Sequence, residues 1–237
     1  MRRELHALIL TLVGGTLLKL AFTGDYARYV KPGVRPLLVA AAVVVLAIAA
    51  ATLQRRDRRD HADGDGHAHR HSRFDVAWLL LLPMLVLLLL APPALGSFSA
   101  ARSGTALGAA PASDQPPLPE GDPVRLSMMD YASRAVYDNG RSLAGRHLTL
   151  SGFVLPGDGG TWYLTRMVIT CCAADAQPIK VGLTGTVPGR LKANDWIQVT
   201  GSYATRKDRD PVNQEPIPYL SVESSTPIPA PARQYES

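Results

Sequence analysis

Two adjacent cysteines, Cys171 and Cys172, are the only cysteines in this chain of 237 residues, and Asp175 follows them closely. Thiolate and carboxylate groups are ligands for zinc and for other transition metals. Three ligands within five residues leave one coordination position for water, for His147 or for a group from a partner protein. The alternative is structural, because cysteine is often a small buried residue that closes a strand. The sequence therefore leaves two alternatives for the same residues, a metal site or a purely structural role.

The local backbone decides whether the two thiols can act together. Successive side chains of a strand point to opposite faces, so Cys171 and Cys172 share a metal only if the chain leaves β geometry. The following residues 173–175 provide room for such a turn. We expect Arg166 to steady a thiolate or Asp175 by its charge. In an oxidising compartment the same two thiols also permit a strained vicinal disulfide, which would act as a redox switch.

A second, weaker metal candidate lies in a polar segment rich in histidine. Four of the six histidines occur there, with aspartates between them. Imidazoles at alternate positions can converge on zinc, but histidine-rich segments also occur as polar linkers, and interleaved arginines repel a cation. The candidate ligands are His61, His67, His69 and His71.

Three apolar runs predict a membrane domain over residues 1–96, with spans at 5–22, 37–53 and 76–95. Each run is close to the roughly 20 residues that cross a hydrocarbon core. The first run follows two arginines and would suit a signal peptide, but no small-residue cleavage pattern comes after it. The loop at 54–75 is rich in histidine and arginine. We therefore expect a multi-pass protein of the cell membrane.

The distribution of arginine predicts the orientation of these spans. The loop at 54–75 contains six arginines, whereas the loop between the first two spans contains only Arg28, Lys31 and Arg35. Because short positively charged loops stay in the cytoplasm, the N-terminus is expected inside and the C-terminal domain outside the cytoplasm. Acidic and basic residues nearly balance beyond residue 120, so charge does not indicate nucleic acid as a partner.

The remaining chain is expected to form a flexible linker at 97–123, a β domain at 124–226 and a disordered tail at 227–237. The linker is rich in Ala, Gly, Pro and Ser. Within the β domain, Ser127 suits the N-cap of a short helix at 128–138. Period-two alternation then predicts five short strands, interrupted by glycines, which favours a small OB-like β-barrel over a β-sandwich fragment.

Three motifs in the β domain carry a resemblance to a known family. They are Leu164-Thr165-Arg166, the run Cys-Cys-Ala-Ala-Asp at 171–175, and Trp196-Ile197 followed by Val199 and Gly201. Together with the apolar spans and the linker, they resemble the YcgQ-like family of two-component permease subunits. The resemblance implies a transport role beside a multi-spanning YcgR-like permease, and it implies no catalytic residue.

The sequence thus predicts a non-enzymatic accessory subunit of a membrane permease that binds or gates a transition-metal substrate through its outer domain. The alternative is an extracytoplasmic thiol–disulfide protein or metallochaperone, in which the cysteines turn over. The chain contains no nucleotide-binding loop and no HExxH motif, so ATPase and metalloprotease functions are not expected.

Overall fold

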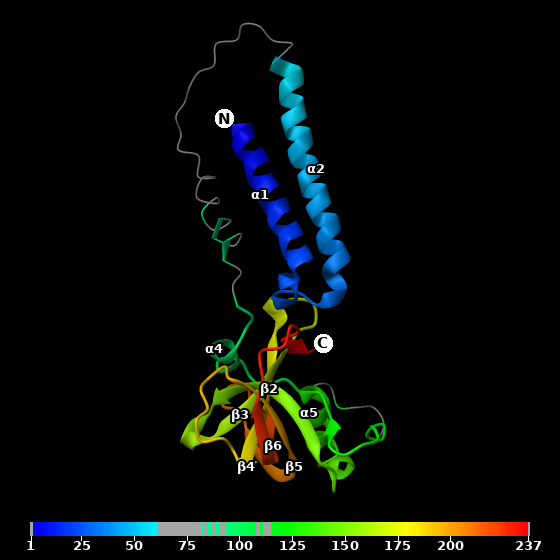
Figure 1. Ribbon diagram of the computed structural model, residues 1–237, viewed down its shortest axis with the longest axis vertical. Coiled ribbons are helices and arrows are strands. Elements are labelled where there is room, and N and C mark those ends of the chain that lie inside the picture. The colour runs from blue at the N-terminus through cyan, green and yellow to red at the C-terminus, as the bar shows by residue number, and fades with distance from the viewer. Residues whose placement is uncertain are drawn as a thin grey trace. The chain divides into compact units, whose positions relative to one another are not determined.

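The structure is a computed structural model that describes residues 2–60, 82, 85–86, 89–90, 93–107, 110 and 115–236. The chain divides into two compact units, Met1–Pro93 and Ala94–Ser237. In the first unit, helices α1 (Arg2–Thr23) and α2 (Arg35–Asp60) are joined by the short 3-10 helices η1 (Asp25–Arg28) and η2 (Pro32–Val34) (Figure 1).

The second unit combines a sheet with short helices (Figure 1). Its strands are β1 (Val124–Arg125), β2 (Leu148–Pro156), β3 (Trp162–Val168), β4 (Gln177–Gly185), β5 (Trp196–Arg209), β6 (Pro216–Pro227) and β7 (Tyr235–Glu236). Its helices are α4 (Ser97–Ala100) and α5 (Met128–Tyr137), and the 3-10 helices are η3 (Arg141–Leu143), η4 (Asp158–Gly160) and η5 (Ala173–Asp175).

Small residues form the contact between α1 and α2. Buried residues recur every seven positions on both helices, a spacing that keeps one side of each helix against its neighbour. A Cβ atom at Gly14 would lie only 2.6 Å from Cγ of Leu46, so glycine is required for this close approach. The residues of this seam are Ala7, Gly14 and Ala21 on α1, and Ala42 and Ala49 on α2.

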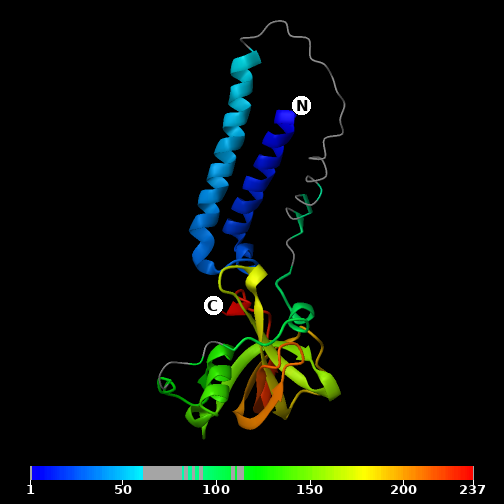
Figure 2. The same ribbon diagram turned by 180° about the vertical axis from the view of Figure 1, so that it is seen from behind.

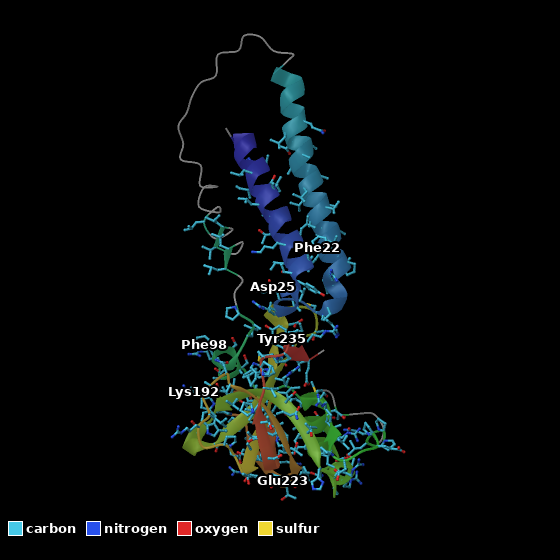
Figure 3. The ribbon with its side chains drawn as sticks, viewed as in Figure 1. Phe22, Asp25, Phe98, Lys192, Glu223 and Tyr235 are labelled. Carbon is cyan, nitrogen blue, oxygen red and sulfur yellow. The ribbon has the colours of Figure 1, made fainter. Side chains whose placement is uncertain are left out.

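The other sides of the two helices expose large apolar side chains. The segments His6–Thr23 and Pro32–Gln54 are long and apolar enough to cross a membrane, a composition that a signal sequence near the N-terminus shares. Only 22% and 11% of their residues are buried, so neither is the core helix of a globular unit. Figure 3 labels one of the exposed side chains, Phe22, near the end of α1. The exposed set is Leu8, Phe22, Leu37, Val43, Val44, Ile48 and Leu53.

The first two predicted spans, 5–22 and 37–53, correspond to α1 and α2. Most of the third predicted span, 76–95, lies outside the described residues, as does most of the predicted loop at 54–75. The third span therefore stays a prediction.

The second unit is built on a seven-stranded mixed sheet in the order β1-β2-β5-β6-β4-β3-β7. Figure 2 shows the ribbon of this unit from behind. β2 pairs with β3 as well as with β5, so the pairings of β2, β5, β6, β4 and β3 return to their starting strand. Within this cycle only β4 and β6 run parallel. The five strands predicted from alternation are present, and the two-residue strands β1 and β7 extend the sheet.

Two glycines allow neighbouring strands of the sheet to approach closely. A Cβ atom at Gly152 of β2 would lie 2.5 Å from the carbonyl oxygen of Thr165 in β3. A Cβ atom at Gly201 of β5 would lie 2.0 Å from the carbonyl oxygen of Ser221, beside an irregularity in the β5–β6 register. Any side chain at either position would push the strands apart.

Helix α5 begins and ends close to where its local signals predict. The Ser127 hydroxyl accepts a hydrogen bond from the Asp130 N–H at 3.0 Å, which satisfies a free donor at the helix start. Asn139 and Gly140 adopt positive φ angles of 55° and 71°, which end the helix. Its buried side, which includes Met128 and Tyr131, packs into the main core of the unit.

The prediction of a flexible linker at 97–123 is wrong for residues 97–107, because this segment completes a buried ion pair. Lys180 and Asp210, 3% and 0% exposed, lie 2.7 Å apart. Lys180 Nζ also donates to the carbonyl oxygen of Ser103 at 2.8 Å, and the Thr105 N–H donates to Asp210 Oδ2 at 2.8 Å. A buried pair needs such additional hydrogen bonds, and they order the segment that supplies them.

The prediction of a disordered tail at 227–237 is wrong for residues 227–236. β6 extends to Pro227, and the Ile228 N–H donates to the carbonyl oxygen of Trp196 at 2.9 Å. Tyr235 and Glu236 then form β7, parallel to the end of β3. The end of β3, beyond the residues that pair with β2, therefore orders a segment that has little apolar character of its own.

Candidate metal site

The two cysteines lie in the loop between β3 and β4, residues 169–176, which we call the metal loop. Buried Ile169 anchors its start. The chain bends at Thr170 and Cys171, and Cys172 has extended backbone angles of φ −152° and ψ 171°. The 3-10 helix η5 then turns the chain back, so that Asp175 returns toward Cys171.

The Asp175 carboxylate organises this loop. Its Oδ1 accepts the N–H of Thr170 at 3.0 Å, and its Oδ2 accepts the N–H of Cys171 at 2.8 Å. The Asp175 N–H in turn donates to the carbonyl oxygen of Cys172 at 3.1 Å. The turn expected from the sequence is therefore present, and it closes through the carboxylate that was expected to bind the metal.

Cys171, Cys172 and Asp175 each offer one ligand atom, and these atoms all lie within 4.8 Å of one another. In the described part of the chain, no other group of three or more His, Cys, Asp or Glu residues comes together in this way. Cys171 is exposed, whereas Cys172 is half-buried. Two sulfurs on one tetrahedral zinc lie about 3.8 Å apart, so a small contraction of the loop suffices.

A thiol–carboxylate hydrogen bond sets the electrostatics of the site. The hydrogen bond to Asp175, together with one to Cys172, raises the pKa of the Cys171 thiol to about 11. The same hydrogen bond from Cys171, helped by the backbone N–H groups, lowers the pKa of Asp175. At neutral pH the loop thus contains a charged carboxylate and a protonated thiol. A metal ion would take the place of the thiol proton.

A shallow, polar depression of about 320 Å³ opens beside Asp175. Asn213, from the β5–β6 loop, donates its Nδ2–H to the carbonyl oxygen of Thr105 at 3.0 Å and so holds one side of the depression. Sequence reasoning missed these contributions, because they come from distant segments that carry no local motif. The depression is lined by Ser103, Gly104, Ala174, Asp175, Ala176, Gln177 and Asn213.

Comparison with family models identifies both halves of the chain. The DUF1980 N-terminal domain matches residues 5–106, and the DUF1980 C-terminal domain matches residues 120–236. The chain belongs to the DUF1980 family. The metal loop lies entirely within the DUF1980 C-terminal domain. No curated protein and no solved structure matches the chain.

Arg166 does not take the supporting role that was expected for it in the DUF1980 C-terminal domain. Its guanidinium carbon lies 5.0 Å from the ring centroid of Trp196, and Nη2 donates to the carbonyl oxygen of Arg233 at 3.2 Å. Its Nε lies 3.9 Å from Glu236 Oε1. Burial lowers the pKa of Arg166. Arg166 thus interacts with the end of the chain, and its predicted role beside the thiolates is wrong.

His147, the other proposed supporting residue, belongs to a different part of the DUF1980 C-terminal domain. Its Nδ1 lies 2.9 Å from Asp122 Oδ2 and its Nε2 lies 3.7 Å from Glu223. Figure 3 shows Glu223 at the end of the unit opposite Tyr235, whereas β7 pairs beside the start of the metal loop. His147 is therefore not the fourth ligand, because the fold places it near the other end. The hydrogen bond with Asp122 raises the pKa of His147.

The histidine-rich candidate cannot be compared with this site. His61, His67, His69 and His71 all lie outside the described residues. Their metal binding stays a prediction.

Proposed function

We propose that this DUF1980 protein is a non-enzymatic, membrane-anchored accessory subunit of a permease, as the YcgQ-like resemblance implies. Its C-terminal domain captures a transition-metal ion, with zinc as the leading candidate, at Cys171, Cys172 and Asp175. The observation that carries this proposal is the convergence of three ligand atoms within 4.8 Å on an accessible loop.

The ligand set suits capture and transfer of a metal ion. Thiolates favour zinc and other soft or borderline ions over magnesium and calcium. Structural zinc sites are closed by four protein ligands, whereas three ligands leave a position open. An open position on an exposed loop allows a metal to arrive with one ligand and to leave with another. This behaviour fits a subunit that passes its ion to a permease.

The protonation state of the Cys171 thiol supports metal capture over the alternative, a thiol–disulfide protein. Disulfide exchange requires a thiolate, and cysteines that act in exchange have lowered pKa values. In contrast, Asp175 raises the pKa of Cys171 to about 11. A metal cation would be attracted by the carboxylate that suppresses thiolate formation. The same loop chemistry therefore favours a cation and disfavours redox turnover.

The strand pairings support an OB-like barrel as the scaffold of the site. Five strands pair in a cycle that returns to β2, with β4 and β6 parallel, as expected for a small closed barrel. A closed sheet has no free edge among its own strands and is a rigid support for functional loops. On this scaffold the metal loop connects two neighbouring antiparallel strands.

The exposed apolar surfaces of α1 and α2 support the membrane part of the proposal. These helices would cross the membrane with the N-terminus in the cytoplasm, and the DUF1980 C-terminal domain would lie outside the cytoplasm. A third span at 76–95 would precede that domain. The partner would be a multi-spanning permease that contacts the apolar surfaces of the helices.

A calorimetric zinc titration of the reduced full-length protein in mild detergent tests the proposal. The wild-type protein should bind about one ion in the metal loop and release protons as it does so. Asp175→Asn should weaken this binding event by about 10–100-fold. Cys171→Ser and Cys172→Ser should each weaken it more, because each removes a thiolate ligand. The matched control is Asp158→Asn, which makes the same change at an exposed residue outside the metal loop.

The cysteine variants also distinguish the metal loop from the histidine-rich segment, since both cysteine substitutions leave all the histidines in place. Zinc uptake that survives both cysteine substitutions unchanged would overturn the proposed site, as would the absence of uptake by the wild-type protein.

A further inference from the structure

A second polar site in the C-terminal unit already holds a ligand, the side chain of Glu236. Its Oε1 accepts the N–H of Met128 at 2.9 Å, and its Oε2 accepts the N–H of Met129 at 3.2 Å. These are the first two residues of the ten-residue helix α5. Free N–H groups and the helix dipole favour an anion there, and Arg166 adds a positive charge 3.9 Å from Glu236 Oε1. We call these groups the carboxylate cradle.

The segment that carries this carboxylate, residues 228–236, also holds the start of the metal loop, and we call it the strap. Its strand β7 pairs with β3 through Met167 opposite Tyr235 and Val168 opposite Glu236. The Ile169 N–H then donates to the carbonyl oxygen of Glu236 at 3.2 Å. Cys171 follows only two residues later, so the strap fixes the backbone that leads into the metal ligands.

The strap reaches a third segment through Tyr235. Its ring is 8% exposed and packs in a small apolar cluster that contains Phe153, Met167 and Ile169. Its hydroxyl oxygen accepts the N–H of Leu95 at 2.9 Å. Figure 3 shows Tyr235 at the end of the unit that also carries Phe98. The strap therefore bridges the segment at 94–100 and the metal loop.

We propose that the strap is an intramolecular ligand of the carboxylate cradle and that it couples metal occupancy of the metal loop to the segment at 94–100. This inference rests on the proposed metal site. A metal would draw an oxygen of Asp175 away from the N–H of Thr170 or Cys171. The order of the metal loop then depends on the bound metal and on Ile169, whose N–H donates to the strap. With the strap in place, the metal loop loses less backbone freedom when the metal binds.

Thermodynamic linkage gives this coupling a second, independent consequence. If the strap strengthens metal binding, the metal must stabilise the strap by the same factor. Metal binding should therefore slow the opening of the hydrogen bond between Leu95 and Tyr235, as well as those between α5 and Glu236. A strap that only completes the fold would show neither effect.

The test uses the reduced full-length protein in mild detergent with zinc chloride as the probe. Glu236→Gln removes the charge from the cradle, and Tyr235→Phe removes the hydroxyl that accepts the Leu95 N–H but retains the ring. The matched control is Glu223→Gln, the same substitution at the opposite end of the unit (Figure 3). Zinc affinity is measured by competition with a chromophoric chelator, and hydrogen exchange is followed at residues 94–100 and 128–131.

We expect Glu236→Gln to weaken zinc binding by about fivefold, the lower end of typical coupling factors, and Glu223→Gln to leave it unchanged. Zinc should slow exchange at 94–100 in the wild-type protein, and Tyr235→Phe should abolish that protection. Circular dichroism verifies folding. If Glu236→Gln does not fold, Tyr235→Phe decides the question, because it retains the buried ring.

The outcomes distinguish the two proposals. If the wild-type protein binds zinc in the metal loop but zinc leaves exchange at 94–100 unchanged and the strap variants bind zinc normally, the coupling is overturned and the metal site stands. If the wild-type protein binds no zinc, both are overturned.

Discussion

The pair Cys171 and Asp175 determines how the site should respond to pH. The carboxylate keeps the thiol protonated, because it raises the pKa of Cys171 to about 11. The metal must displace this proton, so zinc affinity should rise with pH across the neutral range. Each proton released on binding contributes about a tenfold rise in apparent affinity per pH unit. The site is thus expected to bind more strongly in neutral than in acidic surroundings.

Asp175→Asn should have two opposite effects in a Cys172→Ser background. Without the carboxylate, the pKa of Cys171 falls toward its ordinary value, so the thiolate fraction rises and alkylation by iodoacetamide at pH 8 should accelerate by about tenfold or more. Zinc binding should weaken at the same time, because a ligand is lost. Timed alkylation with mass spectrometry measures the first effect. An unchanged alkylation rate would show that Asp175 does not control the thiol.

Residue types in the sequence pointed to three residues that the structure brings together, but they could not identify the residues around them. Cys171, Cys172 and Asp175 are close in sequence, and a local turn suffices to bring them together. The positions of Arg166 and His147 depend on which strands become neighbours. Both have other partners that lie far away in the sequence, Glu236 for Arg166 and Asp122 for His147.

At the scale of elements, the sequence predicted best those helices and strands that depend on capping residues and on the alternation of apolar residues. The N-cap at Ser127 and the positive φ at Gly140 set the limits of α5, and alternation located the five longer strands. The segments at 97–107 and 227–236 were expected to be unstructured because their composition is polar or rich in proline. They are ordered by groups elsewhere in the fold, namely the Lys180–Asp210 pair and the edge of β3.

The buried ion pair between Lys180 and Asp210 leads to a prediction about the stability of the C-terminal unit. Asp210→Asn should lower the free energy of unfolding by about 3–5 kcal/mol, because Lys180 would be left as a buried charge without its counterion. The segment at 103–105 should become accessible to proteases at the same time. Thermal and denaturant unfolding, followed by tryptophan fluorescence, measure the change. Asp158→Asn is the control, and a loss below about 1 kcal/mol for Asp210→Asn would contradict this account of the pair.

At the scale of the whole molecule, the proposal requires the cysteines to lie outside the cytoplasm. Cys171 and Cys172 are the only cysteines in the chain, so thiol labelling reports the location of one loop. A membrane-impermeant maleimide added to intact cells should label the wild-type protein. In a variant that lacks both cysteines and carries Ser72→Cys, labelling should require permeabilised cells, because the six arginines around this position favour the cytoplasm. The reverse pattern would show that the orientation is inverted.

X-ray absorption at the zinc edge tests the central claim most directly, since it reports which atoms surround the bound ion. The reduced full-length protein loaded with one equivalent of zinc should show two sulfur neighbours at about 2.3 Å, with the remaining oxygen or nitrogen neighbours at about 2.0–2.2 Å. Cys171→Ser and Cys172→Ser should each remove one sulfur. A first shell of oxygen and nitrogen alone in the wild-type protein would contradict metal capture by Cys171 and Cys172.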